Sequence, residues 1–115
     1  MRPHVTAKAR RDILAILATS RAQFGLDAQR RYRVMLEQAI RDIAENPQRP
    51  GVASPSDLPE GLRLYHTRHA RSHLPLETRV GRPRHFVAFR LVDDVVEVLR
   101  VLHDAMDLAR QLRDV

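Results

Sequence analysis

The sequence FVAFRLVDDVVEVLRVL, residues 86–102, holds two runs of alternating side chains on either side of a pair of aspartates. In the first run, Phe86, Ala88 and Arg90 share one side, and Val87, Phe89 and Leu91 share the other. In the second run, Val96, Val98, Arg100 and Leu102 lie opposite Val95, Glu97, Leu99 and Val101. Val92-Asp93-Asp94-Val95 is typical of a tight turn, so the pattern predicts a β-hairpin. Both faces of both strands carry apolar residues, and we therefore expect the hairpin to be covered on both sides.

The segments that flank this hairpin differ in character. Residues 62–66 predict another strand, and residues 47–61 predict a connecting loop because they are rich in proline, glycine and serine. The stretch 67–84 is basic and shows little sign of helical periodicity, so we expect a loop there. Residues 104–112 predict a short terminal helix.

Two amphipathic helices are predicted nearer the N-terminus. The first spans about residues 7–23, with Thr6 as its N-cap and Gly25 as the residue that ends it. The second begins near Asp27 and ends at Asn46, before a proline. Its apolar face consists of Ala28, Tyr32, Met35, Leu36, Ala39, Ile40 and Ile43. Because few residues separate them, the two helices should pack as an antiparallel hairpin.

The order of elements defines the fold class. A short strand at 4–6 is followed by two helices, three strands and a tail. Helices followed by strands indicate an α+β fold, in which the N-terminal helical hairpin packs on one face of a small, mostly antiparallel sheet. The whole chain, 1–115, is expected to form one domain, since compact domains commonly contain about 100–200 residues.

Composition narrows the classes of function. The net charge is +6, almost entirely from arginine, because Lys8 is the sole lysine. This balance indicates either an acidic partner or arginines that merely solvate helix faces. The absence of cysteine excludes disulfides and thiolate chemistry, and no apolar run reaches the roughly 20 residues that span a bilayer. We therefore expect a cytoplasmic protein without a secretory signal.

Four local features together resemble the ParE branch of the ParE/RelE toxin superfamily. These are Thr6-x-x-Ala9-x-x-Asp12-Ile13, Phe24-Gly25-x-x-Ala28, the stretch from Leu36 to Pro47, and the terminal segment 98–107, VLRVLHDAMD. The last is the most specific, because it is similar to the closing strand of ParE toxins and their R-x-L-H-x-x-M-D tail. One departure is that the segment 66–84 is longer than in typical ParE toxins.

The resemblance implies a partner and a mode of action. A ParE-type protein is the toxin of a type II toxin–antitoxin pair. It forms a hetero-oligomer with a ParD-like antitoxin, and it arrests growth by binding DNA gyrase without hydrolysing anything. The RelE branch uses the same fold to cut messenger RNA on the ribosome, which is the alternative function. Contacts with the target are expected at Arg100, His103, Met106 and Asp107, and contacts with the antitoxin at Met35, Leu36, Ile40 and Leu108.

The alternative function has its own candidate residues. RNA cleavage needs a base, an acid and cationic donors around one phosphate. Arg84, His85, Arg90, Arg100 and His103 could supply them if they gather on the sheet. Both tyrosines, Tyr32 and Tyr65, lie elsewhere in the sequence, which favours the binding toxin. The structural alternative is that Arg100 pairs with Glu97 or Asp107 and that His103 caps the edge of the sheet.

The basic stretch and its histidines admit two further interpretations. No Cys, Asp or Glu between His66 and His73 completes a metal site with His66, His69 and His73, even with His85 nearby, so neither a metal nor a cofactor is expected. The arginines between 68 and 84 indicate either a surface for phosphates or an acidic protein, or a solvated mobile loop.

Overall fold

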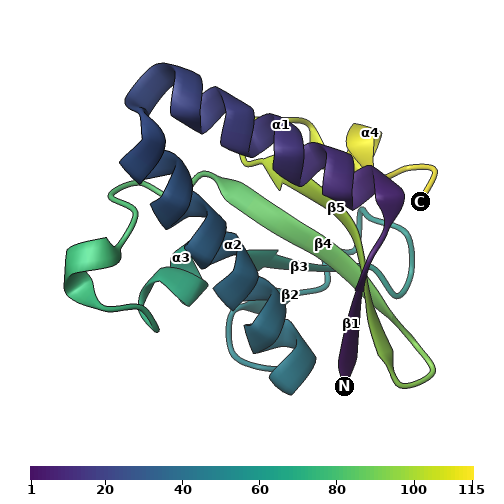
Figure 1. The fold of residues 1–115 in the computed structure, drawn as a ribbon. Coiled ribbons are helices and arrows are strands. Elements are labelled where there is room, and N and C mark those ends of the chain that lie inside the picture. The colour runs from purple at the N-terminus through teal and green to yellow at the C-terminus, as the bar shows by residue number, and fades with distance from the viewer.

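The computed structural model describes residues 1–115 and contains two long helices and a five-stranded sheet (Figure 1). The helices are α1 (Ala7–Phe24) and α2 (Leu26–Glu45), and the strands are β1 (Arg2–Val5), β2 (Val52–Ala53), β3 (Arg63–His66), β4 (His85–Val92) and β5 (Val95–His103). Three short helices complete the chain: α3 (Thr67–Arg71), the 3₁₀ helix η1 (Leu76–Thr78) and α4 (Leu108–Gln111). The predicted α+β fold is confirmed.

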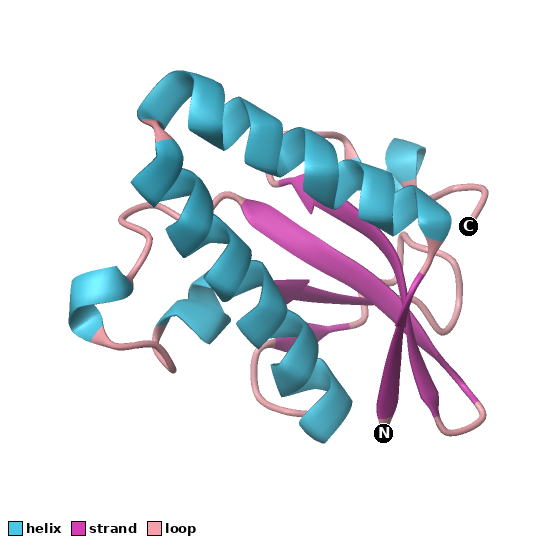
Figure 2. Ribbon diagram, viewed as in Figure 1, coloured by secondary structure: helices cyan, strands magenta, loops and turns pink.

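The sheet has the order β1-β5-β4-β3-β2. Strand β1 runs parallel to β5, and every other neighbouring pair is antiparallel. Figure 2 shows both long helices on the same side of this sheet. The first predicted strand lies slightly earlier than expected, at residues 2–5, and β2 interrupts the predicted loop 47–61.

The helical hairpin forms as its sequence signals predict. The Thr6 hydroxyl accepts a hydrogen bond from the Ala9 backbone N–H at 3.1 Å, which satisfies a donor in the first turn of α1. Gly25 joins the two helices with a φ of 94°, a conformation that an L side chain rarely adopts. The direction of α2 is therefore fixed within one residue of the end of α1.

The sheet is covered on both faces, as the hairpin pattern predicts. Val87 and Phe89 of β4 belong to the larger core cluster, together with Met35 and Ile43 of α2. Ala88, between them in sequence, belongs to a second cluster. Besides strand residues, that cluster contains Leu58, Leu62 and Leu112, with Leu108, Ala109 and Val115 packed against it. The C-terminal segment and the 54–62 loop therefore cover the face that the helices leave free.

A β-bulge changes the predicted alternation in β5. Ala88 pairs with Arg100 and Phe89 pairs with Val98, so Leu99 is an extra residue in its strand. Val98 and Val101 consequently share one core cluster, whereas Leu99 and Leu102 share the other. The prediction of strict alternation was wrong beyond this point.

The basic segment 67–84 is more ordered than its sequence suggests. It contains α3 and η1, where the sequence predicts a loop. The His66 ring caps α3 by accepting a hydrogen bond from the Arg68 N–H at 3.0 Å. Arg79 braces the segment by donating to the Leu74 carbonyl at 2.8 Å. Contacts distant in sequence, rather than helical periodicity, stabilise this stretch. None of the helices is both long and apolar enough to cross a membrane.

Candidate functional site

Four polar residues meet where β3 ends, β4 begins and β5 ends. The antiparallel register places His85 opposite His103 and brings His66 beside β4. The His85 and His103 rings contact edge to face, with centroids 5.2 Å apart. Asp104 follows β5 directly, and its backbone N–H donates to the Arg84 carbonyl at 2.8 Å. One end of the sheet therefore concentrates titratable side chains from three strands.

Asp104 is the anionic centre of this cluster. Its carboxylate lies 3.0 Å from His66 Nε2, 3.3 Å from Arg84 Nε and 3.6 Å from His103 Nδ1. Desolvation acts to raise the pKa of Asp104, but the hydrogen bond with His66 and the charge of Arg84 together outweigh it and leave the pKa lowered. The pKa of His66 is lowered, and burial of the ring is the largest cause of this shift. Asp104 therefore stays ionised and holds Arg84 in place.

Tyr32 joins the cluster from α2, which corrects the expectation that both tyrosines lie elsewhere. Its hydroxyl is 2.5 Å from His85 Nδ1 and accepts a hydrogen bond from the Arg84 N–H at 3.1 Å. Burial lowers the pKa of His85 to about 4, with the neighbouring His103 adding to the effect. Burial also raises the pKa of Tyr32. Near neutral pH the hydroxyl therefore donates to an uncharged imidazole.

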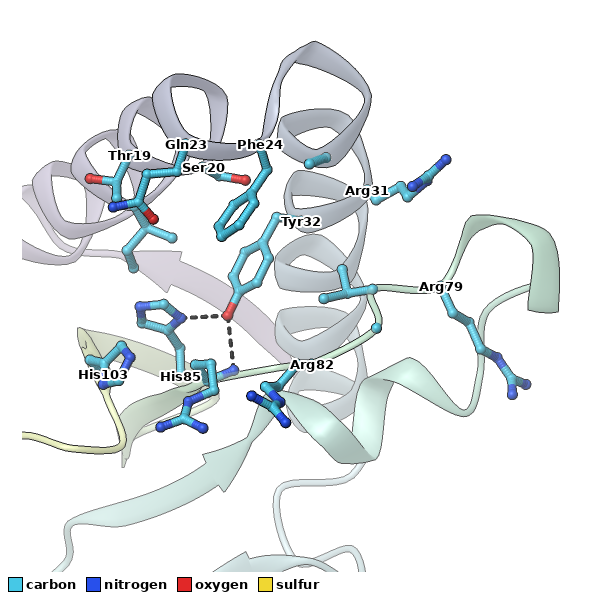
Figure 3. A pocket seen from close by; sticks show the side chains of 15 residues that line it. Thr19, Ser20, Gln23, Phe24, Arg31, Tyr32, Arg79, Arg82, His85 and His103 are labelled. Atoms are coloured by element: carbon cyan, nitrogen blue, oxygen red, sulfur yellow. Dashed lines mark hydrogen bonds between the residues drawn. The ribbon is translucent and has the colours of Figure 1, made fainter.

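A cavity of about 610 Å³ opens beside this cluster. It lies between the α1–α2 turn and the segment 79–85, with Tyr32, His85 and His103 along its wall (Figure 3). Its other lining residues are Ile16, Thr19, Ser20, Gln23, Phe24, Ala28, Arg31, Arg79, Val80, Gly81, Arg82 and Arg84. Four of these are arginines and none is a carboxylate, so the cavity is suited to an anionic ligand.

The two remaining arginines of the predicted catalytic set lie apart from the cavity. Arg90 pairs with Glu97 at 2.8 Å in the β-hairpin. Arg100 donates from Nε and Nη2 to Asp12 of α1, at 2.7 and 3.1 Å. The expectation that Arg100 pairs with Glu97 or Asp107 was therefore wrong. Arg84, His85 and His103 are brought together, but the five residues do not surround one point.

The predicted contacts with the target occupy different environments. His103 is half-buried, and its Nδ1 accepts a hydrogen bond from the Ala105 N–H at 3.0 Å. Met106 is 47% exposed, and Asp107 is an exposed residue that caps α4. The Arg100 side chain is only 14% exposed. The end of β5 and the following tail therefore form a surface from which Arg100 is largely withdrawn.

The predicted contacts with an antitoxin need a correction. Met35 and Leu36 are 0% and 2% exposed, because both point from α2 into the core between helices and sheet. Ile40 and Leu108 are half-buried at the margins of the two core clusters. Of the four residues, these last two are accessible to a partner.

The histidines of the basic segment serve separate contacts. His69 stacks on the Tyr65 ring at 5.3 Å, and His73 Nδ1 lies 2.9 Å from Asp42. The chain contains no group of three or more His, Cys, Asp or Glu residues arranged to hold a metal ion.

Three aspartates that each bind more than one group were not predicted from the sequence as site residues. Asp12 accepts from Arg100 and from the Val101 N–H, Asp42 accepts from the Tyr65 hydroxyl at 2.8 Å, and Asp104 binds His66 and Arg84. Asp12 and Arg100 are 88 positions apart, so no local pattern could pair them. The segments that resemble the family did contain Asp12 and Asp104, which was the one available signal for these two residues.

Comparison with known proteins agrees with this arrangement. A family model described as the ParE toxin of the type II toxin–antitoxin system parDE matches residues 4–108, which include both long helices, the hairpin and the cluster around Asp104. No curated protein matches the chain. Since the family model covers nearly the whole length, the chain belongs to the ParE toxin family of type II toxin–antitoxin systems.

Proposed function

We propose that this protein arrests growth by binding and poisoning DNA gyrase in the cytoplasm, and that a ParD-like antitoxin neutralises it in a hetero-oligomer. Membership of the ParE family supports a toxin with an antitoxin partner. The choice of a binding poison over a nuclease depends on the site itself.

The candidate catalytic residues lie apart from one another, and this separation favours a binding poison over a nuclease. Cleavage of RNA needs its base, acid and cationic donors around a single phosphate. Here Arg90 and Arg100 are each neutralised by a carboxylate and lie apart from the cavity. His85 has a pKa of about 4, which makes it a weak base, and its Nδ1 is already engaged by Tyr32. These properties favour recognition over catalysis.

The proposed contact surface for gyrase is formed by His103, Met106 and Asp107. An exposed methionine offers an adaptable apolar contact, and the flanking polar groups add directional ones. Arg100 contributes through its pair with Asp12, which fixes the end of β5. Ile40 and Leu108 supply apolar contacts for the antitoxin at two other margins of the fold.

Induced expression in a bacterial host tests the proposal. We expect growth arrest with gyrase-dependent double-strand breaks and with intact transcripts. A chain carrying Met106→Asp and His103→Ala should lose the arrest, whereas Arg33→Ala, an exposed change on α2, should retain it. The DNA breaks and the transcripts should be measured in the same cultures. Cleaved transcripts with intact DNA would contradict gyrase poisoning.

One observation supports the second candidate, a RelE-like messenger RNA endoribonuclease. Tyr32, His85, His103 and Arg84 do gather beside an open cavity, which provides hydroxyl, imidazole and guanidinium groups within one small region. Under this alternative, Tyr32→Phe and His85→Ala would each abolish transcript cleavage. Under the gyrase proposal they alter stability alone.

A further inference from the structure

The basic segment 67–84 holds most of the chain's excess positive charge. It contains five arginines against one acidic residue, Glu77, which amounts to +4 of the net charge of +6. Arg71 and Arg79 donate to backbone carbonyls within the segment, which orders it. The arginines that remain for a partner are Arg68, Arg82 and Arg84.

These three arginines keep donors that the fold does not use. Arg84 approaches Asp104 through Nε alone, at 3.3 Å, so its two terminal amino groups have no partner within the chain. Arg68 and Arg82 are exposed, and neither side chain forms a salt bridge or a hydrogen bond. The Arg68 N–H donates to the ring of His66, whose other nitrogen contacts Asp104. Arg68 and Arg84 therefore flank the same histidine at this end of the sheet.

A neutral donor lies beside them. Figure 3 shows Arg82 on the same side of Tyr32 as His85 and His103, away from the α1–α2 turn. The Nδ1 atom of His103 accepts a hydrogen bond from the Ala105 N–H at 3.0 Å, so in the neutral ring the proton is on Nε2. That N–H has no acceptor within the chain and is free to donate to an anion.

We propose that this end of the sheet binds the phosphate backbone of duplex DNA through Arg68, Arg82, Arg84 and the Nε2 atom of His103. Arginine suits the role because its planar guanidinium binds phosphate oxygens through parallel hydrogen bonds. The proposed gyrase contacts begin at His103 and continue to Met106, so one surface touches both the enzyme and its DNA. The inference rests on the proposed function in one respect, since the DNA is taken to be the segment that gyrase holds.

Single-stranded RNA fits this surface less well than a duplex does. Proteins hold single strands largely by stacking bases on aromatic side chains. The aromatic rings here are covered, because Tyr32 is 9% exposed, Tyr65 is 0% exposed, and Phe86 is half-buried with its ring against His66 at 4.7 Å. Contacts with phosphates are what remains, and such contacts bind a duplex without reading its sequence.

An acidic protein is also a poorer match for these arginines. More than half of a typical protein interface is apolar. No large apolar side chain is exposed within residues 66–70 or 82–85, which contain the three arginines. The arginines therefore offer charge and hydrogen bonds without the apolar contacts that a protein partner requires.

Fluorescence anisotropy on the purified full chain, without gyrase, tests the inference. The probe is a labelled DNA duplex of about 20 base pairs, titrated over a range of salt concentrations. Three phosphate contacts predict that the logarithm of the association constant falls against the logarithm of salt with a slope of about −3. A single-stranded oligoribonucleotide of equal length and a glutamate-rich peptide test the alternatives, and we expect each to bind at least about three-fold more weakly than the duplex.

Variants at the arginines separate these contacts from general electrostatics. Arg68→Ala with Arg82→Ala should make the slope shallower by about 2 and weaken binding at low salt by about ten-fold or more. Arg11→Ala with Arg33→Ala removes the same charge from exposed positions on the two long helices and should change the slope by less than about 0.5. Arg68→Lys with Arg82→Lys keeps the charges and should keep most of the slope. Circular dichroism verifies that each chain is folded.

Three results would overturn the inference: an unchanged slope in the Arg68→Ala, Arg82→Ala chain, an equal loss in the helix control, or tighter binding of the RNA or the peptide than of the duplex. These measurements contain no gyrase, so they are independent of the proposed function. Duplex binding through these arginines without inhibition of gyrase would leave the DNA contact in place and refute the target. Inhibition of gyrase by a chain whose slope does not depend on them would do the reverse.

Discussion

Replacing Asp12 with alanine should destabilise the fold more than any exposed substitution, because it leaves the Arg100 charge without its partner. Asp12 and Arg100 have side chains that are 16% and 14% exposed, and the carboxylate also accepts the Val101 N–H at 3.0 Å. Removing one member of a buried ion pair costs about 3–5 kcal/mol. Since both groups retain some contact with solvent, we expect about 3 kcal/mol, or a fall in Tm of about 10 °C.

A double substitution isolates the charge as the cause. Asp12→Ala with Arg100→Met removes both charges and keeps an apolar side chain of similar length on β5. We expect this chain to recover about 2 kcal/mol relative to Asp12→Ala alone. Urea and thermal unfolding followed by circular dichroism measure the full cycle. A loss below about 0.5 kcal/mol for Asp12→Ala, or no recovery in the double variant, would refute the assignment of Arg100 as a structural partner of α1.

Three other predictions concern the cluster and the second sheet face. Tyr32→Phe leaves the Arg84 N–H and His85 Nδ1 without their shared partner and should lower the free energy of unfolding by about 1–3 kcal/mol; a urea titration showing no loss would argue against this contact. Leu112→Ala should cost about 2–5 kcal/mol, because Leu112 is 0% exposed and fills the C-terminal cluster, and a shift in Tm comparable to that of an exposed residue would contradict this packing. The free energy of unfolding should also decrease as the pH is lowered, because the pKa of His85 in the folded chain, about 4, lies below the ordinary value near 6.5. As the pH falls, the unfolded chain binds a proton at His85 before the folded chain does, so the stability that neutral His85 allows is complete above about pH 6.5 and is lost toward pH 4. With allowance for solvent screening, this loss is about 1–2 kcal/mol. In a measurement of unfolding free energy against pH, His85→Gln should flatten the curve between these two pH values.

Local patterns in the sequence were sufficient for much of the fold. The helical hairpin has a Thr6 cap, a continuous apolar stripe and a glycine at the one position that needs a positive φ. The strands β4 and β5 alternate with period two around a turn that contains Asp93, itself at a φ of 54°. Each of these signals acts between neighbouring residues, which is why the sequence alone predicts them.

The parts that were mispredicted depend on contacts distant in sequence. Helix α3 is too short to show a period, and it is stabilised by packing against α2 and by the His73–Asp42 contact. The bulge at Leu99 changes which side chains face the helices without changing the composition of the strand. Strict alternation therefore assigned Val101 and Leu102 to the wrong faces.

The candidate site was predicted only in part, because some of its contacts are local and others join residues distant in sequence. Arg84, His85 and His103 belong to adjacent ends of a predicted hairpin, so their proximity follows from its register. Tyr32 reaches them from a helix 53 positions away from His85, and only the packing of α2 on the sheet reveals that contact. The family resemblance indicated the fold, whereas the gathering of four arginines around one cavity could be seen only in the three-dimensional arrangement.

The most direct test of the central claim is a supercoiling and cleavage assay with purified DNA gyrase and the purified chain. We expect supercoiling to be inhibited and linear, gyrase-linked DNA to accumulate with increasing toxin, with the Met106→Asp, His103→Ala chain inactive at equal concentration. Undiminished supercoiling by gyrase at saturating toxin, while the same preparation arrests growth on expression, would contradict the account.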